Sequence, residues 1–302
     1  MATHLHVHGA PDAVLKPFLH ASLPVALVGW WEYATRAANG IDADAWSLRL
    51  SSHVFPGDPS AAALLAGSMH PLPLLLTSVL VCGFWTRLFA HWRRLPVDPA
   101  WLLTAWLLFL LLPPDSTPGV VAAGASVAAV VGLLVFGGTG NYPLSPPLLG
   151  ALCTALAYPG FTAAPLGGAS ATACTLGAVY LAARGTIGWR VPLGGALGAA
   201  TFLTAVTALQ DDAMRAVDGM AQQAGPLAFV LAFIATDLTT TPLMRSVRWL
   251  LGFSIASLCL LLMATGMAPA NAALRAAAIG LLCAPLADRL AEHIHAWRRQ
   301  HA

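Results

Sequence analysis

The chain has 302 residues, of which 58% are hydrophobic and only 9% are charged, with a net charge of +2. Soluble domains carry about 25% charged residues, so this composition excludes an ordinary soluble protein and predicts an integral membrane protein. The small net charge says nothing about nucleic acid, no nucleic-acid partner is predicted, and the first partner that the composition implies is the lipid membrane.

Ten apolar stretches are long enough, or nearly long enough, to cross a bilayer as helices. They predict an all-α integral membrane protein with about ten transmembrane helices in a single membrane domain at 15–288. A polar, His-rich tail at 1–14 precedes this domain and a basic tail at 289–302 follows it. In chain order the stretches lie at 15–33, 62–85, 99–113, 117–136, 146–160, 169–184, 190–209, 223–237, 247–265 and 269–287.

The distribution of basic residues predicts the orientation of these spans, because cytoplasmic loops carry an excess of Lys and Arg. With a cytoplasmic N-terminus, eleven basic residues fall inside: Lys16, Arg87, Arg93, Arg94, Arg184, Arg190, Arg245, Arg248, Arg289, Arg298 and Arg299. Four fall outside, namely Arg36, Arg49, Arg215 and Arg275. We therefore expect a multi-pass protein of a bacterial inner membrane with both termini in the cytoplasm.

The N-terminal tail contains three alternating histidines, His4, His6 and His8. On an extended chain they would share one side and could bind a soft divalent metal, and a disordered tail is the alternative interpretation. The five cysteines form no Cys-x-x-Cys pair, so no metal site is predicted. No phosphate-binding loop, dinucleotide fingerprint or catalytic triad is present, and no catalytic residue is predicted.

Two segments suggest an internal duplication. Phe109–Pro118 (FLLLPPDSTP) and Phe233–Pro242 (FIATDLTTTP) each end an apolar stretch with an Asp, hydroxyl residues and a proline. Five predicted spans separate them and they face opposite sides, as two inverted five-helix repeats with broken, re-entrant helices would require. We expect these repeats at about 15–160 and 169–288, and a chance match of two short segments is the alternative.

Three segments rich in Gly, Pro, Ser and Thr interrupt the apolar pattern, at 136–147, 165–172 and 236–242. Unpaired backbone groups are costly in a membrane unless they line a cavity, so these segments mark a candidate binding site. Free amides in the first segment, beside a helix start at Pro146, could hold an anionic group. Tight loops with capped helices are the alternative, with Ser170 and Asp237 as caps. The candidate cofactor-binding residues are Gly137, Gly138, Thr139, Asn141, Ser170, Thr172, Asp237, Thr239 and Thr240.

These segments resemble motifs of the NqrB/RnfD family, the flavin-carrying membrane subunits of the sodium-pumping NADH:quinone reductase and of the Rnf electron-transport complex. Val135–Pro147 (VFGGTGNYPLSPP), followed by Ala157-Tyr-Pro, is similar to the family's V-F-G-G-x-G-x-N-x-x-N-P and A-Y-P. Leu103–Pro114, Leu181–Leu193 and Phe233–Pro242 resemble three further family motifs. The resemblance covers about 75–290.

The chain departs from the family in the outer loop where a threonine carries covalent FMN. That loop is nearly gone, and the remaining pattern, Ala169-Ser-Ala-Thr172, lacks the family's acidic residue. Leu238 also replaces the proline after Asp237, and Ser145-Pro146 replaces an Asn-Pro. The resemblance therefore implies FMN or riboflavin as a cofactor and leaves the covalent attachment open.

The resemblance implies a membrane-embedded electron-transfer subunit that holds a flavin and relays electrons between partner subunits of a redox complex, coupled to ion translocation. A channel or transporter of urea-transporter-like fold is one alternative, since it would use the same broken helices as a substrate path. A cofactor-free assembly subunit is another. Whether the chain belongs to an enzyme's catalytic machinery stays open at this point.

Overall fold

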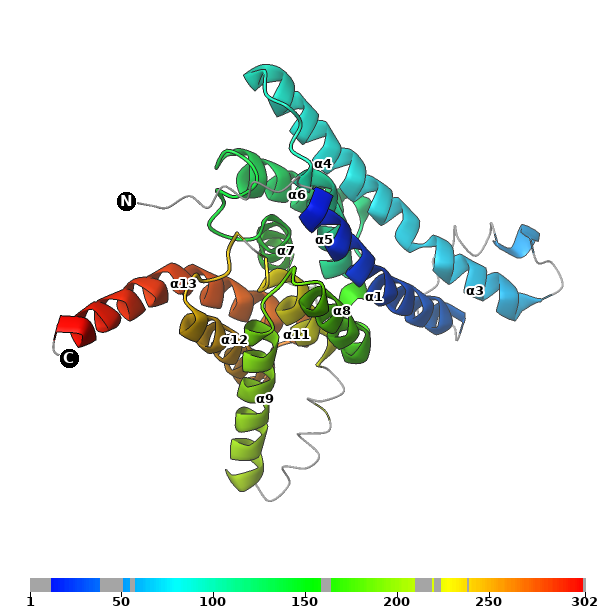
Figure 1. Ribbon diagram of the computed structural model, residues 1–302. Helices are drawn as coiled ribbons and strands as arrows, with labels where there is room; N and C mark the ends of the chain where they lie inside the picture. The colour runs from blue at the N-terminus through cyan, green and yellow to red at the C-terminus, as the bar shows by residue number, and fades with distance from the viewer. Residues whose placement is uncertain are drawn as a thin grey trace.

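The computed structural model describes residues 12–38, 51–54, 58–158, 164–209, 219, 224–237 and 239–300. Within these residues the secondary structure is helical and no strand occurs (Figure 1). The main helices are α1 (Asp12–Ala38), α3 (Pro59–Met69), α4 (Pro71–Arg93), α5 (Ala100–Leu111), α6 (Pro118–Val127), α7 (Pro146–Ala157), α8 (Ala171–Ala183), α9 (Arg190–Leu209), α11 (Gly225–Phe229), α12 (Arg245–Ala264) and α13 (Pro269–Gln300).

A helix occurs at each of the ten positions where the sequence predicts a span. In the described residues, four helical segments are long and apolar enough to cross a membrane unaided, namely Ser60–Arg93, Arg190–Ala208, Arg245–Ala264 and Pro269–Ile294. Five are shorter and apolar, namely Ala100–Leu111, Pro118–Leu134, Pro146–Ala157, Ala171–Ala183 and Gly225–Ile234. The all-helical prediction is confirmed, and the number of spans remains a prediction.

The shorter helices form the centre of the molecule. In Figure 1 α5, α7 and α11 lie in the middle, whereas α3, α9 and the end of α13 reach outward. α5 is apolar on every side, which is the pattern of a helix surrounded by others, and its Leu108, Phe109 and Leu110 are buried. α7 packs on α5 and α6, and α13 packs on α11 and α12. α1 contacts α8, and α7 contacts α13.

Small residues allow the closest helix contacts. A Cβ on Gly252 of α12 would collide with the carbonyl oxygen of Val191 on α9. Membrane helices depend on such close backbone approach, because apolar side chains gain little by leaving lipid for protein. Gly252 therefore fixes how α12 packs against α9.

Two of the central helices widen into π-helices before they end. α6 continues as the π-helical segment Ala128–Leu134, and α11 continues as Val230–Ile234. π-Helical turns are rare and often occur next to functional sites. Both segments lead directly into the loops that the sequence marks as candidate binding segments.

Several helices extend beyond the predicted spans. α4 reaches Arg93, so Arg87 and Arg93 lie on a helix and not in an inner loop. α13 continues to Gln300, so most of the predicted C-terminal tail is helical. Hydropathy locates the apolar part of a helix, whereas its end depends on capping and breaking residues beyond that part.

Candidate functional site

The loop after the first π-helical segment is held by the carboxylate of Asp98. The backbone amide of Thr139 donates to Asp98 Oδ2 at 2.6 Å, the Thr139 hydroxyl donates to Asp98 Oδ1, and the amide of Ala100 also donates to Oδ1 at 2.9 Å. Gly137 and Gly138 have φ angles of 99° and 93°, which L side chains rarely adopt. A single acidic side chain thus connects the start of α5 to the glycine turn.

A second carboxylate, Asp237, lies after the other π-helical segment. The buried Tyr142 donates its hydroxyl to Asp237 Oδ2 at 3.2 Å. The amide and the hydroxyl of Thr239 donate to Oδ1 at 3.2 and 3.0 Å. Asp98 lies close enough to Tyr142 for the two to interact electrostatically. We call Asp98, Thr139, Tyr142, Asp237 and Thr239 the Asp237 cluster.

The Asp237 cluster offers oxygen atoms and no positive side chain. Neither Asp98 nor Asp237 has an Arg or Lys nitrogen within 4.0 Å in the described part of the chain, and hydroxyl and amide groups satisfy them instead. Thr240 Oγ1 is buried and has no hydrogen-bond partner among the described residues. Such a site suits a neutral hydrogen-bonding group or a hard cation, and it disfavours an anion.

Four amides of the glycine loop are engaged within the protein. The amide of Gly137 donates to Leu134 O at 3.2 Å, and that of Gly138 donates to Leu133 O at 2.9 Å. The amide of Asn141 donates to Gly138 O at 3.3 Å, and that of Thr139 donates to Asp98. These four amides, which belong to four predicted binding residues, are therefore not free to hold an anion.

Of the two predicted caps, only Ser170 caps a helix. Its hydroxyl accepts from the amide of Ala173 at 3.3 Å at the start of α8, and it is hydrogen-bonded to the hydroxyl of the exposed Thr172 at 2.8 Å. Asp237 instead closes its own turn. Just before α12, the amides of Leu243 and Met244 donate to Asp288 of α13 at 2.9 and 3.3 Å, which ties this turn to α13.

The nine predicted binding residues fall into two separate groups. A Cβ on Gly225, the first residue of α11, would collide with Gly168 beside the start of α8, so the two helices begin at the same end. Asp237 lies twelve residues beyond Gly225, at the opposite end, or about 18 Å along a helix. Gly137, Gly138, Thr139, Asn141, Asp237, Thr239 and Thr240 therefore belong to one end, and Ser170 and Thr172 belong to the other.

Sequence reasoning missed two members of the Asp237 cluster as site residues, Asp98 and Tyr142. Asp98 precedes Pro99 at a helix start, and Asp before Pro is a common turn signal, so that pattern could have drawn attention to it. Tyr142 lies inside the motif shared with the family, but no spacing rule connects it to Asp237.

A second polar group surrounds Asp115, the acid of the segment that resembles the one around Asp237. The hydroxyl of Tyr33 donates to Asp115 Oδ1 at 3.2 Å. Tyr33 stacks on His70 with 5.4 Å between the ring centroids, and His70 Nε2 lies 3.1 Å from Pro114 O. The acid in each of the two similar segments thus accepts from a tyrosine hydroxyl.

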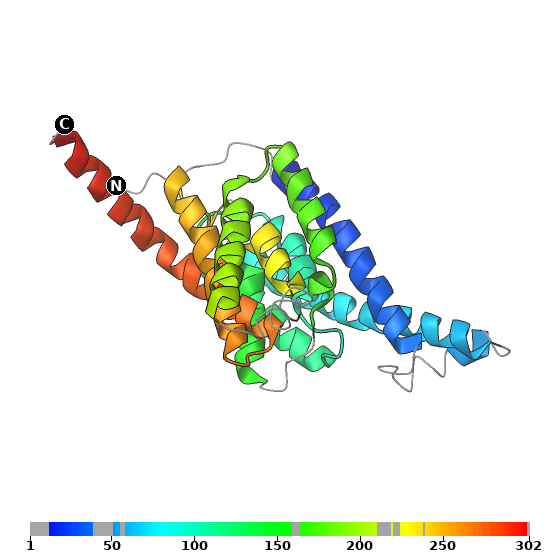
Figure 2. The same cartoon turned by 90° about the horizontal axis from the view of Figure 1, so that it is seen from below.

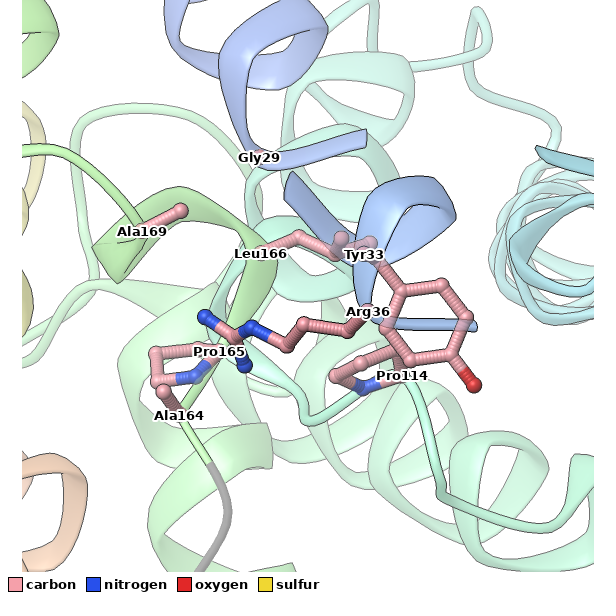
Figure 3. Close-up of a pocket in the computed structure, with 8 residues that line it drawn as sticks. All are labelled: Gly29, Tyr33, Arg36, Pro114, Ala164, Pro165, Leu166 and Ala169. Carbon is pink, nitrogen blue, oxygen red and sulfur yellow. The ribbon is translucent and has the colours of Figure 1, made fainter. Parts of the chain in front are cut away.

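A pocket adjoins this second group (Figure 3). Figure 3 shows the Arg36 side chain lying between Pro114 and Pro165, with Tyr33 beside it. The cavity volume of the pocket is about 10 Å³, far below the roughly 300–1,000 Å³ of a typical small-molecule site. The pocket as it stands is therefore too small for a flavin ring.

No group of three or more His, Cys, Asp or Glu side chains in the described ranges is arranged to hold a metal ion. His4, His6 and His8, the residues of the alternating N-terminal pattern, lie outside those ranges.

Comparison with known proteins gives one consistent result. The model of the NQR2, RnfD, RnfE family matches residues 1–164 and 160–295. The chain is 29% identical over 273 residues to the NqrB subunit of the Na(+)-translocating NADH-quinone reductase of Pseudoalteromonas atlantica, covering 75% of this chain and 68% of the relative. The NqrB subunits of Pseudomonas aeruginosa and Azotobacter vinelandii are 28% and 27% identical over 305 and 303 residues. These matches cover 85% and 84% of this chain, and 76% and 75% of the relatives.

Proposed function

The chain belongs to the NQR2, RnfD, RnfE family, and from that we propose that it is a membrane subunit of a redox complex that holds a flavin and relays electrons between partner subunits, coupled to ion translocation. The observation that carries this proposal is the hydrogen bond from Tyr142 to Asp237. It joins two segments that each resemble a separate family motif, the glycine loop and the Asp237 turn. The relatives' names describe one subunit of a larger reductase, which supports further subunits as partners.

We also propose that this multi-pass membrane protein has ten spans in two inverted five-helix repeats. Corresponding helix contacts support the duplication. α4 contacts α5 and α6. In the same way, α9 contacts α12 and the π-helical segment that follows α11. α7 contacts α5 and α6, just as α13 contacts α11 and α12. The contacts between the halves, α1 with α8 and α7 with α13, join equivalent helices, as a two-fold relation requires.

A sequence match between the halves supports the same proposal. The link between the fourth and fifth predicted spans reads Thr139-Gly140-Asn-Tyr-Pro143 in the first half and Thr265-Gly266-Met-Ala-Pro269 in the second. Gly140 and Gly266 have φ angles of 97° and 89°. The two links thus share a short sequence and a positive-φ glycine that follows the end of a helix, which supports the duplication.

The residues present fit the two candidate flavins at different places. FMN has a phosphate, and the start of α8 suits an anion because its first-turn amides lack helical acceptors and its first turn has no acidic residue. The exposed Thr172 hydroxyl there would carry a phosphoester. Riboflavin has no phosphate, and the Asp237 cluster, which disfavours anions, would hydrogen-bond to its uncharged groups. A flavin bound at either place would supply the electron-carrying chemistry.

The test is an absorbance spectrum of the purified protein, produced with its native partners, followed by flavin fluorescence in a denaturing gel. A band near about 450 nm that survives as gel fluorescence means covalent FMN. It should disappear in Thr172→Ala and persist in Thr175→Ala, whose exposed hydroxyl lies one turn along α8. A band that denaturation removes means a flavin bound without a covalent link, and a riboflavin held by the Asp237 cluster should give a weaker band in Tyr142→Phe. No band at all would overturn the flavin proposal in favour of a transporter or an assembly subunit.

A further inference from the structure

The last four turns of α13 leave the helix bundle. Ala284 is the last buried residue of the helix, and none of the later residues whose side chains the structure describes is buried. Figure 2 shows this part of α13 running obliquely away from the other helices, with the C-terminus at its tip. An isolated helix of this length is marginal in water, so a surface that covers one of its faces is needed to stabilise it.

The uncovered segment has one apolar face. Leu286, Leu290 and Ile294 are 61%, 57% and 53% exposed and follow one another at four-residue spacing, which places them on one side of the helix. Ile279 and Leu282, which are 50% and 60% exposed, continue this stripe back into the part of α13 that is apolar enough to cross the membrane. The stripe is therefore continuous with a surface that faces lipid.

The period of the stripe favours a flat surface over a partner helix. Ile279 and Trp297 are 18 residues apart, which is five complete turns at about 3.6 residues per turn. The stripe therefore stays on one side of a straight helix. A seam for a supercoiled partner would repeat about every 3.5 residues and would drift around such a helix.

The charges of the segment complement an anionic surface. Asp288 is occupied by the amides of Leu243 and Met244. After it come Arg289, Arg298 and Arg299 against one acid, Glu292, so three positive charges and one negative charge give +2. Glu292 is two residues from Leu290 and therefore lies away from the apolar stripe. Basic residues beside such a stripe are typical of helices that lie at the surface of anionic membranes.

The length of α13 is compatible with this placement. Its 32 residues extend about 48 Å at about 1.5 Å per residue. That exceeds the hydrocarbon core of about 30 Å. Pro285 lies inside α13, directly before the uncovered segment, and a proline removes one helical hydrogen bond and is a usual place for a kink, so the segment after it can turn toward the membrane surface.

We propose that α13 ends as a surface-lying helix, with Leu286, Leu290 and Ile294 in the acyl–headgroup boundary and the arginines bound to anionic phospholipid. This inference does not depend on the flavin. Its test is spin-label accessibility in the full-length protein, with Cys153→Ser and Cys283→Ser removing the reactive native cysteines. Labels are placed at Leu290→Cys and, as a matched control on the polar face, at Glu292→Cys. The protein is reconstituted in nanodiscs that contain phosphatidylglycerol or phosphatidylcholine alone.

In phosphatidylglycerol the label at 290 should be exposed to lipid-soluble oxygen and protected from a water-soluble nickel chelate, with the reverse at 292. Oxygen exposure at 290 should decrease in phosphatidylcholine alone, and also when Arg289, Arg298 and Arg299 are all changed to Gln. If the label at 290 is protected from both reagents, protein covers the stripe. If the label at 290 is as exposed to the nickel chelate as the label at 292, the stripe faces water. Either result overturns the proposal. Identical behaviour in the two lipids would overturn its anionic part.

Discussion

At the glycine turn, the Asp98 carboxylate restricts which residues the backbone can accept. A Cβ on Gly138 would lie 2.6 Å from Asp98 Oδ2, whereas a Cβ on Gly140 would meet nothing within 4 Å, although both glycines have positive φ. These two positions therefore separate backbone strain from the contact with Asp98. Tyr142, three residues after Thr139, extends the same network to Asp237.

We expect Gly138→Ala to destabilise the protein more than Gly140→Ala. Gly140→Ala is the control, because it has only the cost of a side chain at positive φ, on the order of 1–3 kcal/mol. Gly138→Ala has that cost and also the collision of its Cβ with Asp98. Thermal unfolding in detergent should show a lower midpoint for Gly138→Ala. Equal midpoints for the two variants would mean that Asp98 does not hold the turn.

Tyr142→Phe should remove the hydroxyl that links the two loops and leave Asp237 bonded to Thr239 and to the Ser145 hydroxyl. Loss of one partner of a buried polar group costs about 1–3 kcal/mol, so the unfolding midpoint should fall. Tyr158→Phe is the control, because Tyr158 is exposed and its change should stay within about 0.5 kcal/mol. The same small change in both variants would argue against the Tyr142–Asp237 bond.

At the scale of single elements, helix ends carry much of the polar structure. α3 is capped by Asp58 and α8 by Ser170, whereas Asp288 of α13 accepts from the backbone just before α12. A hydrogen bond to a distant segment makes two helices depend on one another, whereas a local cap stabilises only its own helix. The contribution of the local cap of α3 to stability can be tested by varying the pH.

Asp58 accepts from the hydroxyl and amide of Ser60 and from the amide of Ala61, and the pKa of its exposed carboxyl is lowered from 3.8 chiefly by the Ser60 hydroxyl. Because the folded pKa lies below the unfolded one, the stabilisation is complete above 3.8 and is lost as the pH falls through the folded value. The difference in unfolding midpoint between the parent and Asp58→Ala should therefore be constant near neutral pH and vanish in strong acid. A difference that persists in strong acid would show that the charge is not responsible.

At the scale of the whole molecule, the two T-G-x-x-P links make the inverted arrangement testable. If the halves are inverted, Asn141 and Thr265, which are both exposed, face opposite sides of the membrane. Asn141→Cys and Thr265→Cys are compared in a variant without reactive native cysteines, with a membrane-impermeant maleimide added to spheroplasts. Position 265 should react at once, and position 141 should react only after permeabilisation. Reaction of both positions from the same side would contradict the inverted repeats.

The sequence by itself determined the class of the protein, its ten helical segments and its family. A charge content of 9% suits only a lipid environment, and hydropathy and local motifs depend on residues near one another in the chain. The tertiary structure decided which loops meet. Tyr142 is 95 residues from Asp237, and Thr139 is 41 residues from Asp98, so no local period connects either pair. It also decided that four amides of the glycine loop are engaged internally and that Ser170 and Thr172 lie far from Asp237, because the local turn geometry and the packing of α8 against α11 are not readable from hydropathy.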